Sequence, residues 1–191
     1  SSLVKIDLAG RVIQPGVGPF GSSINPAGFI IHRAVHGARE DAGCVAHTHT
    51  VANSAVSALE CGLLPLCIEA MQFWDDVGYH DFEGVTVDES ESPRLVADLG
   101  EKRVLILRNH GAVTVGRTVA EAVIAMMNLE RACEVQIAAL STQRPLRVPD
   151  AAIASKVAGQ ARNFIGAESL EGRTFRAYVR LLEREEPDFS A

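Results

Sequence analysis

Alternating apolar and polar positions predict a series of short strands along the chain. Leu3 to Leu8 alternates as a strand, Ala9-Gly10 makes a turn, and Arg11 to Gln14 returns as a second strand. Gly16 to Ser23 is rich in Gly, Ser and Pro, a composition typical of loops. Further strands are predicted at Cys44 to His49, Val77 to Phe82, Val104 to Leu107 and Ala112 to Val115.

Capping residues mark where the predicted helices begin. Asn25-Pro26 combines a capping side chain with proline at the first helical position, and this helix should run to about Glu40. Thr118 and Glu121 form a capping box before a long helix through about Leu140. Other predicted helices are Val51 to Leu59 (capped by Thr50), Ser92 to Gly100, Asp150 to Phe164 and Leu170 to Glu185, while Glu69 to Trp74 fits a helix or a strand.

The order of these elements predicts an α/β fold. Helices and strands alternate through the middle of the chain, and helices alone follow from about residue 150. Such an order is typical of a layered domain in which helices cover a central sheet. The length of 191 residues fits one domain spanning residues 1–191.

Composition excludes several classes of protein. The net charge is −6, and the most basic stretches are interleaved with apolar residues, so we expect no nucleic-acid partner. No stretch approaches the ~20 apolar residues that span a bilayer, and the first residues do not resemble a signal peptide, so we expect no membrane partner. The four cysteines form no C-x-x-C pair, which favours reduced, buried thiols in a cytoplasmic protein.

The sharpest chemical signal is the His47-Thr48-His49 motif. Side chains alternate across a strand, so His47 and His49 point to the same side and present two imidazoles in parallel. Neutral imidazole is a good ligand for zinc, manganese or iron. The alternative is a pair of partly exposed histidines at the end of a strand.

His110 is the second signal, in the motif Arg108-Asn109-His110-Gly111. It follows a predicted buried strand, and ligands favour the ends of strands in α/β sheets. The alternative is an ordinary turn histidine. Three histidines would leave a fourth position open for water or substrate, as in catalytic metal sites.

An ordered set of motifs resembles the class II aldolase/adducin family over about Leu3 to Ala139. The segments that carry the resemblance are Asn25 to Phe29, Ala38 to Asp41, His47 to Thr50, Cys61 to Pro65, Tyr79 to Phe82, Arg108 to Gly111, Thr114 to Arg117 and Leu129 to Glu134.

The resemblance implies a three-layer α/β/α sandwich around a central mixed, mostly antiparallel sheet. It implies that His47, His49 and His110 hold one divalent metal ion, with Zn favoured and Mn or Fe as alternatives. The family's enzymes use this ion as a Lewis acid that polarises a carbonyl and stabilises an enediolate. Family members include sugar-phosphate aldolases, a ribulose-phosphate epimerase and decarboxylases, and many are tetramers with sites between subunits, which implies a homotetramer here.

The chain departs from the aldolases at two places. Their proton-transfer acid, at the start of the helix before the His-x-His strand, falls here on Gly28, and Glu40 and Asp41 lie at the wrong end of that helix. The Asn-x-Ala-Gly-Phe pattern instead resembles the adducin branch, whose eukaryotic members use the domain as a non-enzymatic module. Ser2 also matches a point well inside the family domain, so an opening segment that helps bind phosphate in the aldolases is expected to be absent.

Other titratable residues are weaker candidates. Glu69 and Asn109 are the candidate catalytic or substrate-contacting residues, although a solvated or capping role suits Glu69 better. His32 and His36 lie one helical turn apart and suit packing, and His80 suits a structural role at a strand end. Glu130 and Glu134 suit a salt-bridged helix face with the adjacent Arg131.

Three functions follow from these patterns. The leading hypothesis is a metal-dependent lyase, aldolase-like or decarboxylating, that acts on a small oxygenated substrate. The second is a non-catalytic binding or scaffold module of the adducin type. The third is a non-haem iron oxygenase, although such enzymes more often use two histidines and a carboxylate.

Overall fold

The central sheet has four strands in the order β3-β6-β5-β4. Its strands are β3 (Cys44–Thr48), β4 (Val77–His80), β5 (Val104–Leu107) and β6 (Gly111–Gly116). They belong to a computed structural model that describes residues 3–17, 23–85, 89–164 and 170–188. Strand β6 is antiparallel to both β3 and β5, and β4 is parallel to β5. The expected mixed, mostly antiparallel sheet is therefore confirmed.

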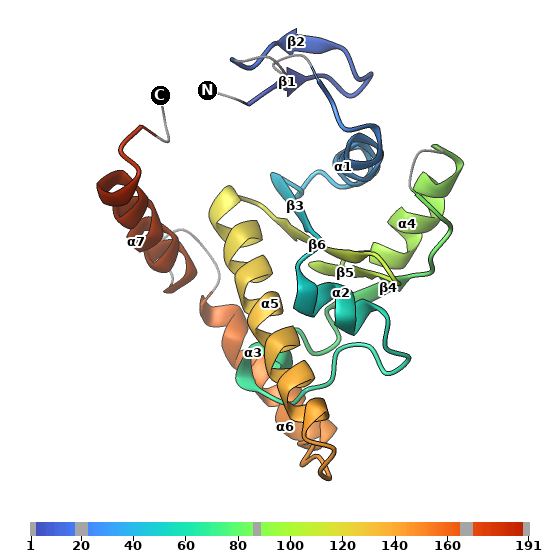
Figure 1. The fold of residues 1–191 in the computed structure, drawn as a ribbon, viewed down its shortest axis with the longest axis vertical. Coiled ribbons are helices and arrows are strands. Elements are labelled where there is room, and N and C mark those ends of the chain that lie inside the picture. Colours follow the sequence, from blue (N-terminus) through green and yellow to red (C-terminus); the bar gives the residue numbers. More distant parts are fainter. Residues whose placement is uncertain (1–2, 18–22, 86–88, 165–169, 189–191) are drawn as a thin grey trace.

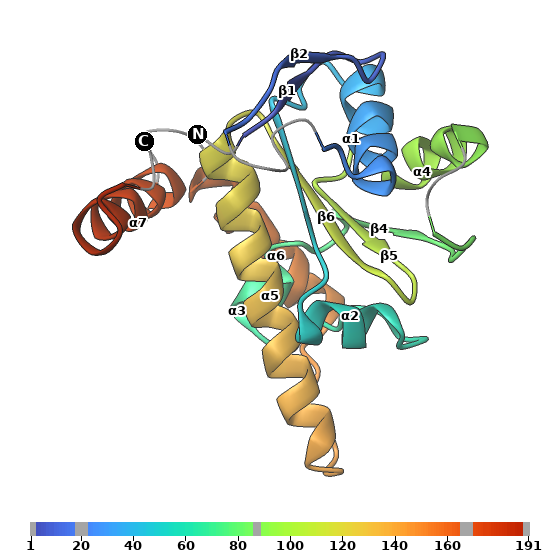
Figure 2. The same cartoon turned by 45° about the horizontal axis from the view of Figure 1, so that its top comes forward.

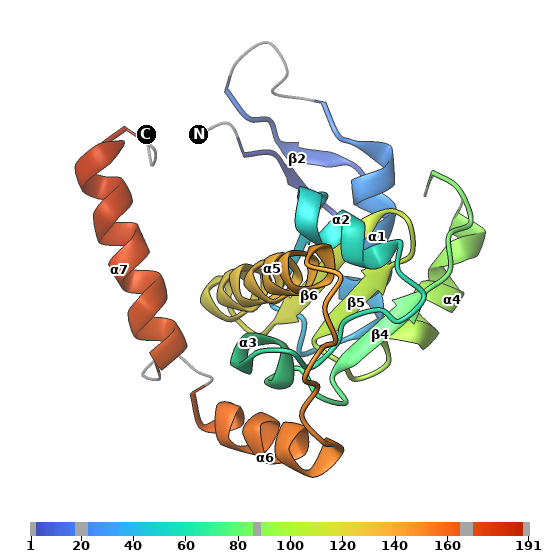
Figure 3. The same cartoon turned by 60° about the horizontal axis from the view of Figure 1, so that its bottom comes forward.

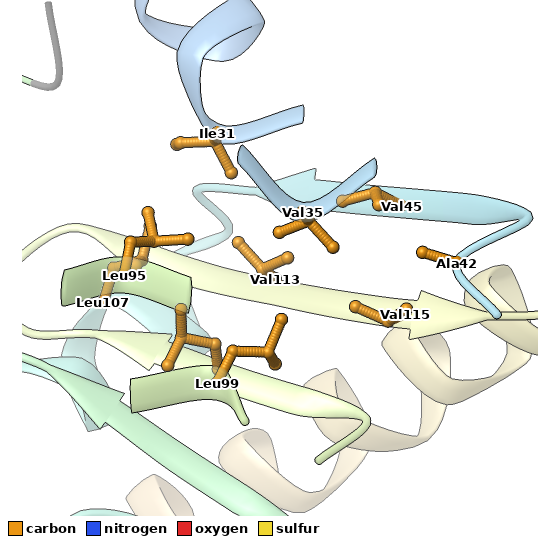
Figure 4. Close-up of a cluster of buried hydrophobic side chains, with 10 residues drawn as sticks. Ile31, Val35, Ala42, Val45, Leu95, Leu99, Leu107, Val113 and Val115 are labelled. Carbon is orange, nitrogen blue, oxygen red and sulfur yellow. The ribbon is translucent and has the colours of Figure 1, made fainter. Parts of the chain in front are cut away.

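Helices α1 (Pro26–Ala38) and α4 (Ser92–Leu99) cover one face of the sheet (Figures 1 and 2). Their apolar side chains, led by Ile31, Val35, Leu95 and Leu99, meet strand residues that include Val113 (Figure 4). Each helix repeats its apolar positions every four residues, so one stripe of each faces the sheet.

The opposite face is covered by α2 (Val51–Ser57) and the long α5 (Val119–Ser141), and α3 (Ile68–Met71) packs against α5. Strand β5 is buried on both faces: Leu105 and Leu107 point towards α1 and α4, whereas Val104 and Ile106 point towards α5. This explains why its sequence is a continuous apolar run instead of an alternating one. The two helical layers around one sheet confirm the three-layer fold.

Most of the predicted helix starts are confirmed. Asn25 accepts hydrogen bonds from the backbone of Ala27 and Gly28, and Asp150 accepts one from Ile153. Thr118 accepts one from the backbone of Glu121. Thr50 occupies the N-cap position of α2 as predicted, but its side chain makes no capping bond and instead donates to Glu130 on α5.

The first two strands are shorter than predicted. β1 (Lys5–Ile6) and β2 (Val12–Gln14) form a separate two-stranded sheet. The Asp7 side chain accepts hydrogen bonds from the backbone of Ala9 and Arg11, and these bonds close a turn where the strand was expected to continue. Part of the loop predicted at Gly16 to Ser23 lies outside the described residues.

The chain ends in α6 (Ala151–Ala161), a short 3-10 helix (Arg162–Phe164) and α7 (Leu170–Glu185). Helix α6 packs against α3, and α7 packs against α5 on the outside of the helical layer (Figures 1 and 3). No described helix has the length and hydropathy needed to cross a membrane. All four cysteines are free, but of the four expected buried thiols only Cys133 is buried, since Cys44 and Cys67 are half-buried and Cys61 is exposed.

Candidate metal centre

Three histidines from two segments meet at one end of the central sheet. His47 is the fourth residue of β3, His49 follows the strand, and His110 precedes β6. Antiparallel pairing places His47 opposite Val113 and Thr48 opposite Ala112, so the turn between β5 and β6 comes beside His49. One nitrogen from each ring lies within 4.8 Å of the others, the only such group of three or more metal-ligand residues among the described positions.

Polar contacts of the His47 ring indicate which of its nitrogens can bind a metal. The His47 Nδ1 atom lies 3.0 Å from the carbonyl oxygen of Ala112, which can only accept, so Nδ1 carries the hydrogen and Nε2 keeps its lone pair. The Nε2 atoms of His47 and His49 are 2.8 Å apart. A backbone carbonyl that fixes the tautomer of one imidazole is a common support for a metal ligand.

Burial keeps the imidazoles neutral. It lowers the pKa of His47 from the ordinary 6.5 to about 4, despite the opposing hydrogen bond to Ala112. Burial also lowers the pKa of His110, and the nearby His49 adds to this effect. Neutral His47 and His110 beside His49 fit a divalent transition metal such as zinc, because such ions bind deprotonated imidazole.

The metal-free protein is expected to lose stability as the pH falls from about 6.5 to about 4, the interval between the ordinary and lowered pKa of His47. In this interval the unfolded chain takes up a proton that the folded chain excludes, so protonation favours unfolding. Urea midpoints measured in chelator at several pH values test this, with His47→Asn as the comparison. The expectation is refuted if the two profiles have the same slope.

Backbone hydrogen bonds hold the turn that carries His110. The Ser54 hydroxyl of α2 donates to the carbonyl of His110, and the backbone of Asn109 donates to the carbonyl of Ser57. Asn109 has a φ of 56°, a left-handed conformation that asparagine tolerates better than most residues. The turn therefore rests on α2, which links the position of His110 to the helix that begins just after His49.

Asn109 and Glu69 lie in different surroundings. Asn109 is exposed and adjacent in sequence to His110. Glu69 lies on α3 and lines a cavity between α3, α5, α6 and α7, whose lining includes none of the three histidines. The proposed roles of both residues stay predictions.

Glu130 is a neighbour of the centre that the sequence pattern did not single out. It was expected to belong to a salt-bridged face, but its carboxylate accepts the hydrogen bond from Thr50, the residue after His49. The expected ion pair on this helix is instead between Arg131 and Glu134, at 3.6 Å and exposed to solvent. Only packing of α5 against β3 and α2 brings Glu130 here, so no local sequence signal marks it.

The remaining histidines have structural partners. His80 is buried with Nδ1 2.7 Å from Asp98 and Nε2 3.1 Å from Glu91, which confirms its structural role. His36 lies 2.9 Å from the carbonyl of Ala42 through Nδ1. His32 stacks on His36 at 6.0 Å between ring centroids, and burial lowers its pKa.

The centre is open to solvent on one side. His49 is exposed, whereas His47 and His110 are half-buried. The hollow that His110 lines together with His80 and Arg108 holds only about 10 Å³, which is too small for a substrate. A substrate would therefore approach the three nitrogens from the exposed side.

Comparison of the sequence with known families and proteins shows what this chain is similar to. Residues 1–137 match the class II aldolase and adducin N-terminal domain. A protein of Caulobacter vibrioides named after the class 2 aldolases is 45% identical over 194 residues, covering 100% of this chain and 72% of its own. Mouse alpha-adducin is 49% identical over 143 residues, which are 74% of this chain but 19% of alpha-adducin.

Solved structures show the same relationship. An aldolase II superfamily protein from Pseudomonas syringae superposes with a TM-score of 0.89 at 43% identity, covering 100% of this chain and 75% of that chain. The L-fuculose 1-phosphate aldolase from Glaciozyma antarctica superposes with a TM-score of 0.78 at 28% identity, covering 96% of this chain and 69% of that chain.

Proposed function

Because the chain belongs to the class II aldolase and adducin N-terminal domain family, we propose that it is a metal-dependent lyase for a small oxygenated substrate. The observation that carries this proposal is the convergence of His47, His49 and His110, whose ligand atoms lie within 4.8 Å of one another. No carboxylate belongs to this group among the described residues, which favours zinc or manganese over the iron oxygenases with two histidines and a carboxylate.

The chain's own residues would hold and orient the metal. When bound, the ion would supply Lewis-acid polarisation of a carbonyl or enediolate oxygen. Burial keeps His47 and His110 neutral, and the Ala112 carbonyl holds the ring of His47 in the tautomer that leaves Nε2 available. Asn109, next to His110 on the exposed side, is the proposed substrate contact.

Gly28 favours decarboxylation over aldol cleavage. Loss of carbon dioxide itself generates a carbanion, so the reaction needs no base that removes a C–H proton. A site that lacks the aldolase acid can therefore still catalyse decarboxylation.

The catalytic role of Glu69 remains a sequence prediction, and a Glu69→Gln variant tests it by its effect on turnover. We further propose a homotetramer, since the open side of the centre leaves room for walls from a second copy.

An activity screen tests the lyase proposal. The protein would be loaded with Zn²⁺ or Mn²⁺ and offered oxo acids, hydroxy acids and sugar phosphates, with His110→Ala as the matched variant. We expect the parent to turn over one class of substrate. The turnover rate of the variant should be at least about 100-fold lower, because the substrate carbonyl would lose the metal ion that polarises it. A fully metallated parent that turns over none of them would contradict the proposal.

The second candidate function is a binding module without catalysis. The 49% identity to mouse alpha-adducin and the glycine at position 28 favour it. This function predicts an assembly whose formation is insensitive to the metal. Light scattering of the protein in chelator and in zinc distinguishes the two functions when it is read beside the activity screen.

A Gly28→Glu variant is expected to be about 1 kcal/mol more stable than the parent. A side chain added at Gly28 would meet only Asn25, at 3.9 Å. Glutamate there has a higher helix propensity than glycine and lies in the first turn of α1, where a negative charge is favourable. Urea unfolding at neutral pH measures the change, and Gly28→Gln separates propensity from charge. A variant less stable than the parent would show that the position is tighter than its contacts indicate.

A further inference from the structure

A second cavity lies on the other side of the molecule from the layer formed by α1 and α4. Its lining comes from α3, α5, α6 and α7, the helices labelled in Figure 3, and it holds about 370 Å³. This volume lies in the range of small-molecule sites. None of the three histidines of the metal centre lines it, so it is a separate feature of the chain.

Glu171, in the first turn of α7, is the unusual residue of its wall. The residue is only 7% exposed, and its Oε2 atom has no hydrogen-bond partner among the described residues. A buried carboxyl oxygen without a hydrogen-bond partner is unfavourable, because nothing around it replaces the hydrogen bonds that it makes to water. An orphaned oxygen in the wall of a cavity therefore points to a ligand that completes its hydrogen bonds.

Arg103, a basic residue whose charge acts on Glu171, does not meet this need. Arg103 lies close enough to Glu171 to affect its charge, but its guanidinium donates to Asp76 at 2.6 Å and lines a different cavity. Burial raises the pKa of Glu171, and the nearby Glu121 adds to the rise. A cation placed in the cavity would oppose both effects.

The rest of the lining selects the chemistry of the ligand. Glu69 is a second carboxylate, and the lining contains no lysine, arginine or histidine among the described residues. The amides of Gln72 and Asn128 are already hydrogen-bonded, since Asn128 donates to Gln72 at 3.3 Å. The acidic wall therefore favours a cation over an anion.

Gln160 and Thr174 are the other polar residues of the lining, and five apolar residues complete it. The apolar residues are Ile68, Ile124, Val157, Ala161 and Leu170. Ile124 is 5% exposed and belongs to the wall contributed by α5, whereas Ile68 and Leu170 are 71% and 53% exposed. Exposed apolar residues around a pocket are typical of surfaces that a ligand covers.

We propose that this cavity binds a small organic amine, whose ammonium group pairs with Glu171 and whose aliphatic body lies against Ile124 and Val157. The pairing converts an orphaned carboxyl oxygen into a charge-assisted hydrogen bond in a site of low polarity. Binding strengthens as the pH rises through the raised pKa of Glu171, because the ammonium selects the ionised carboxylate. The site needs no metal and operates independently of the lyase chemistry.

Titration calorimetry with n-pentylamine tests this inference, with 1-pentanol and pentanoate as the neutral and anionic comparisons. The parent is expected to bind n-pentylamine saturably and at least about 10-fold more tightly than 1-pentanol, since hydrogen bonds to charged groups are the stronger ones. Glu171→Gln should weaken n-pentylamine binding to the level of 1-pentanol. Glu183→Gln, on the exposed face of the same helix, should leave it unchanged.

Two further variants keep the test decisive. Val157→Phe fills the cavity from α6 without changing charge and should abolish binding of n-pentylamine, which covers the case in which Glu171→Gln does not fold. His47→Ala in chelator should bind n-pentylamine as the parent does. The proposed amine site is therefore tested independently of the lyase proposal. Equal affinity for 1-pentanol, or binding that survives in Glu171→Gln, overturns the proposed site.

Discussion

Replacing His47 and His49 together by alanine is expected to remove the metal from the protein. The parent should purify with, or take up, about one equivalent of a transition metal, and the double variant should hold none after dialysis. Changing a residue that only supports a ligand costs 10–100-fold in metal affinity, so losing two ligands should cost more than about 100-fold. Elemental mass spectrometry of both proteins gives the metal identity and the stoichiometry.

The matched control removes the other histidine pair. His32 and His36 on α1 stack at 6.0 Å between ring centroids, and neither belongs to the three-histidine group. A His32→Ala/His36→Ala variant should therefore keep its metal, which excludes nonspecific binding by surface imidazoles. If neither the parent nor this control holds metal after reconstitution, the three histidines are not a metal centre, and the binding-module function becomes the better account.

A Gly111→Ala variant is expected to lose about 3 kcal/mol of stability and at least about 10-fold in metal affinity. An added Cβ would lie 2.4 Å from the carbonyl oxygen of Thr48 and 2.9 Å from the Cδ2 atom of His49. Strands β3 and β6 would have to separate at this point, and overpacking of this kind typically costs 1–3 kcal/mol. Urea unfolding and a competitive zinc titration measure the two effects.

Gly159→Ala is the control for that substitution. An added Cβ on this α6 glycine meets nothing within 4 Å, so alanine should stabilise the protein by about 0.5–1 kcal/mol through its helix propensity. A Gly111→Ala protein as stable as the parent would mean that the strand end shifts at little cost. Lost stability with unchanged zinc affinity would show that the His49 ring moves without leaving the metal.

Local patterns determined most of the elements of this chain. Asn25-Pro26 and Asp150 begin helices as predicted, because a cap acts within three residues of its own position. The run Val104 to Leu107 forms a strand as predicted, because four consecutive apolar residues need cover on both faces. The i, i+2 spacing of His47 and His49 predicted that the two rings lie together, and they do, although β3 ends at Thr48 and His49 lies just beyond it.

The approach of the three ligand atoms and the hydrogen bond of Thr50 depend on tertiary contacts, so local sequence patterns did not predict them. The family resemblance grouped His110 with His47 and His49, although 61 residues separate His49 from His110. The register of β3 on β6 is what brings the ligand atoms within 4.8 Å of one another. Packing of α5 turned the hydroxyl of Thr50 from a helix cap to Glu130.

Glu171 shows the same limit at the second cavity. No sequence pattern singled out this acid in the first turn of α7, yet the folded chain leaves it only 7% exposed. Capping, turns and strand alternation act over a few residues and can be recognised in the chain itself. Burial, register and the sharing of a hydrogen bond depend on which distant surfaces meet, and only the folded structure decides that.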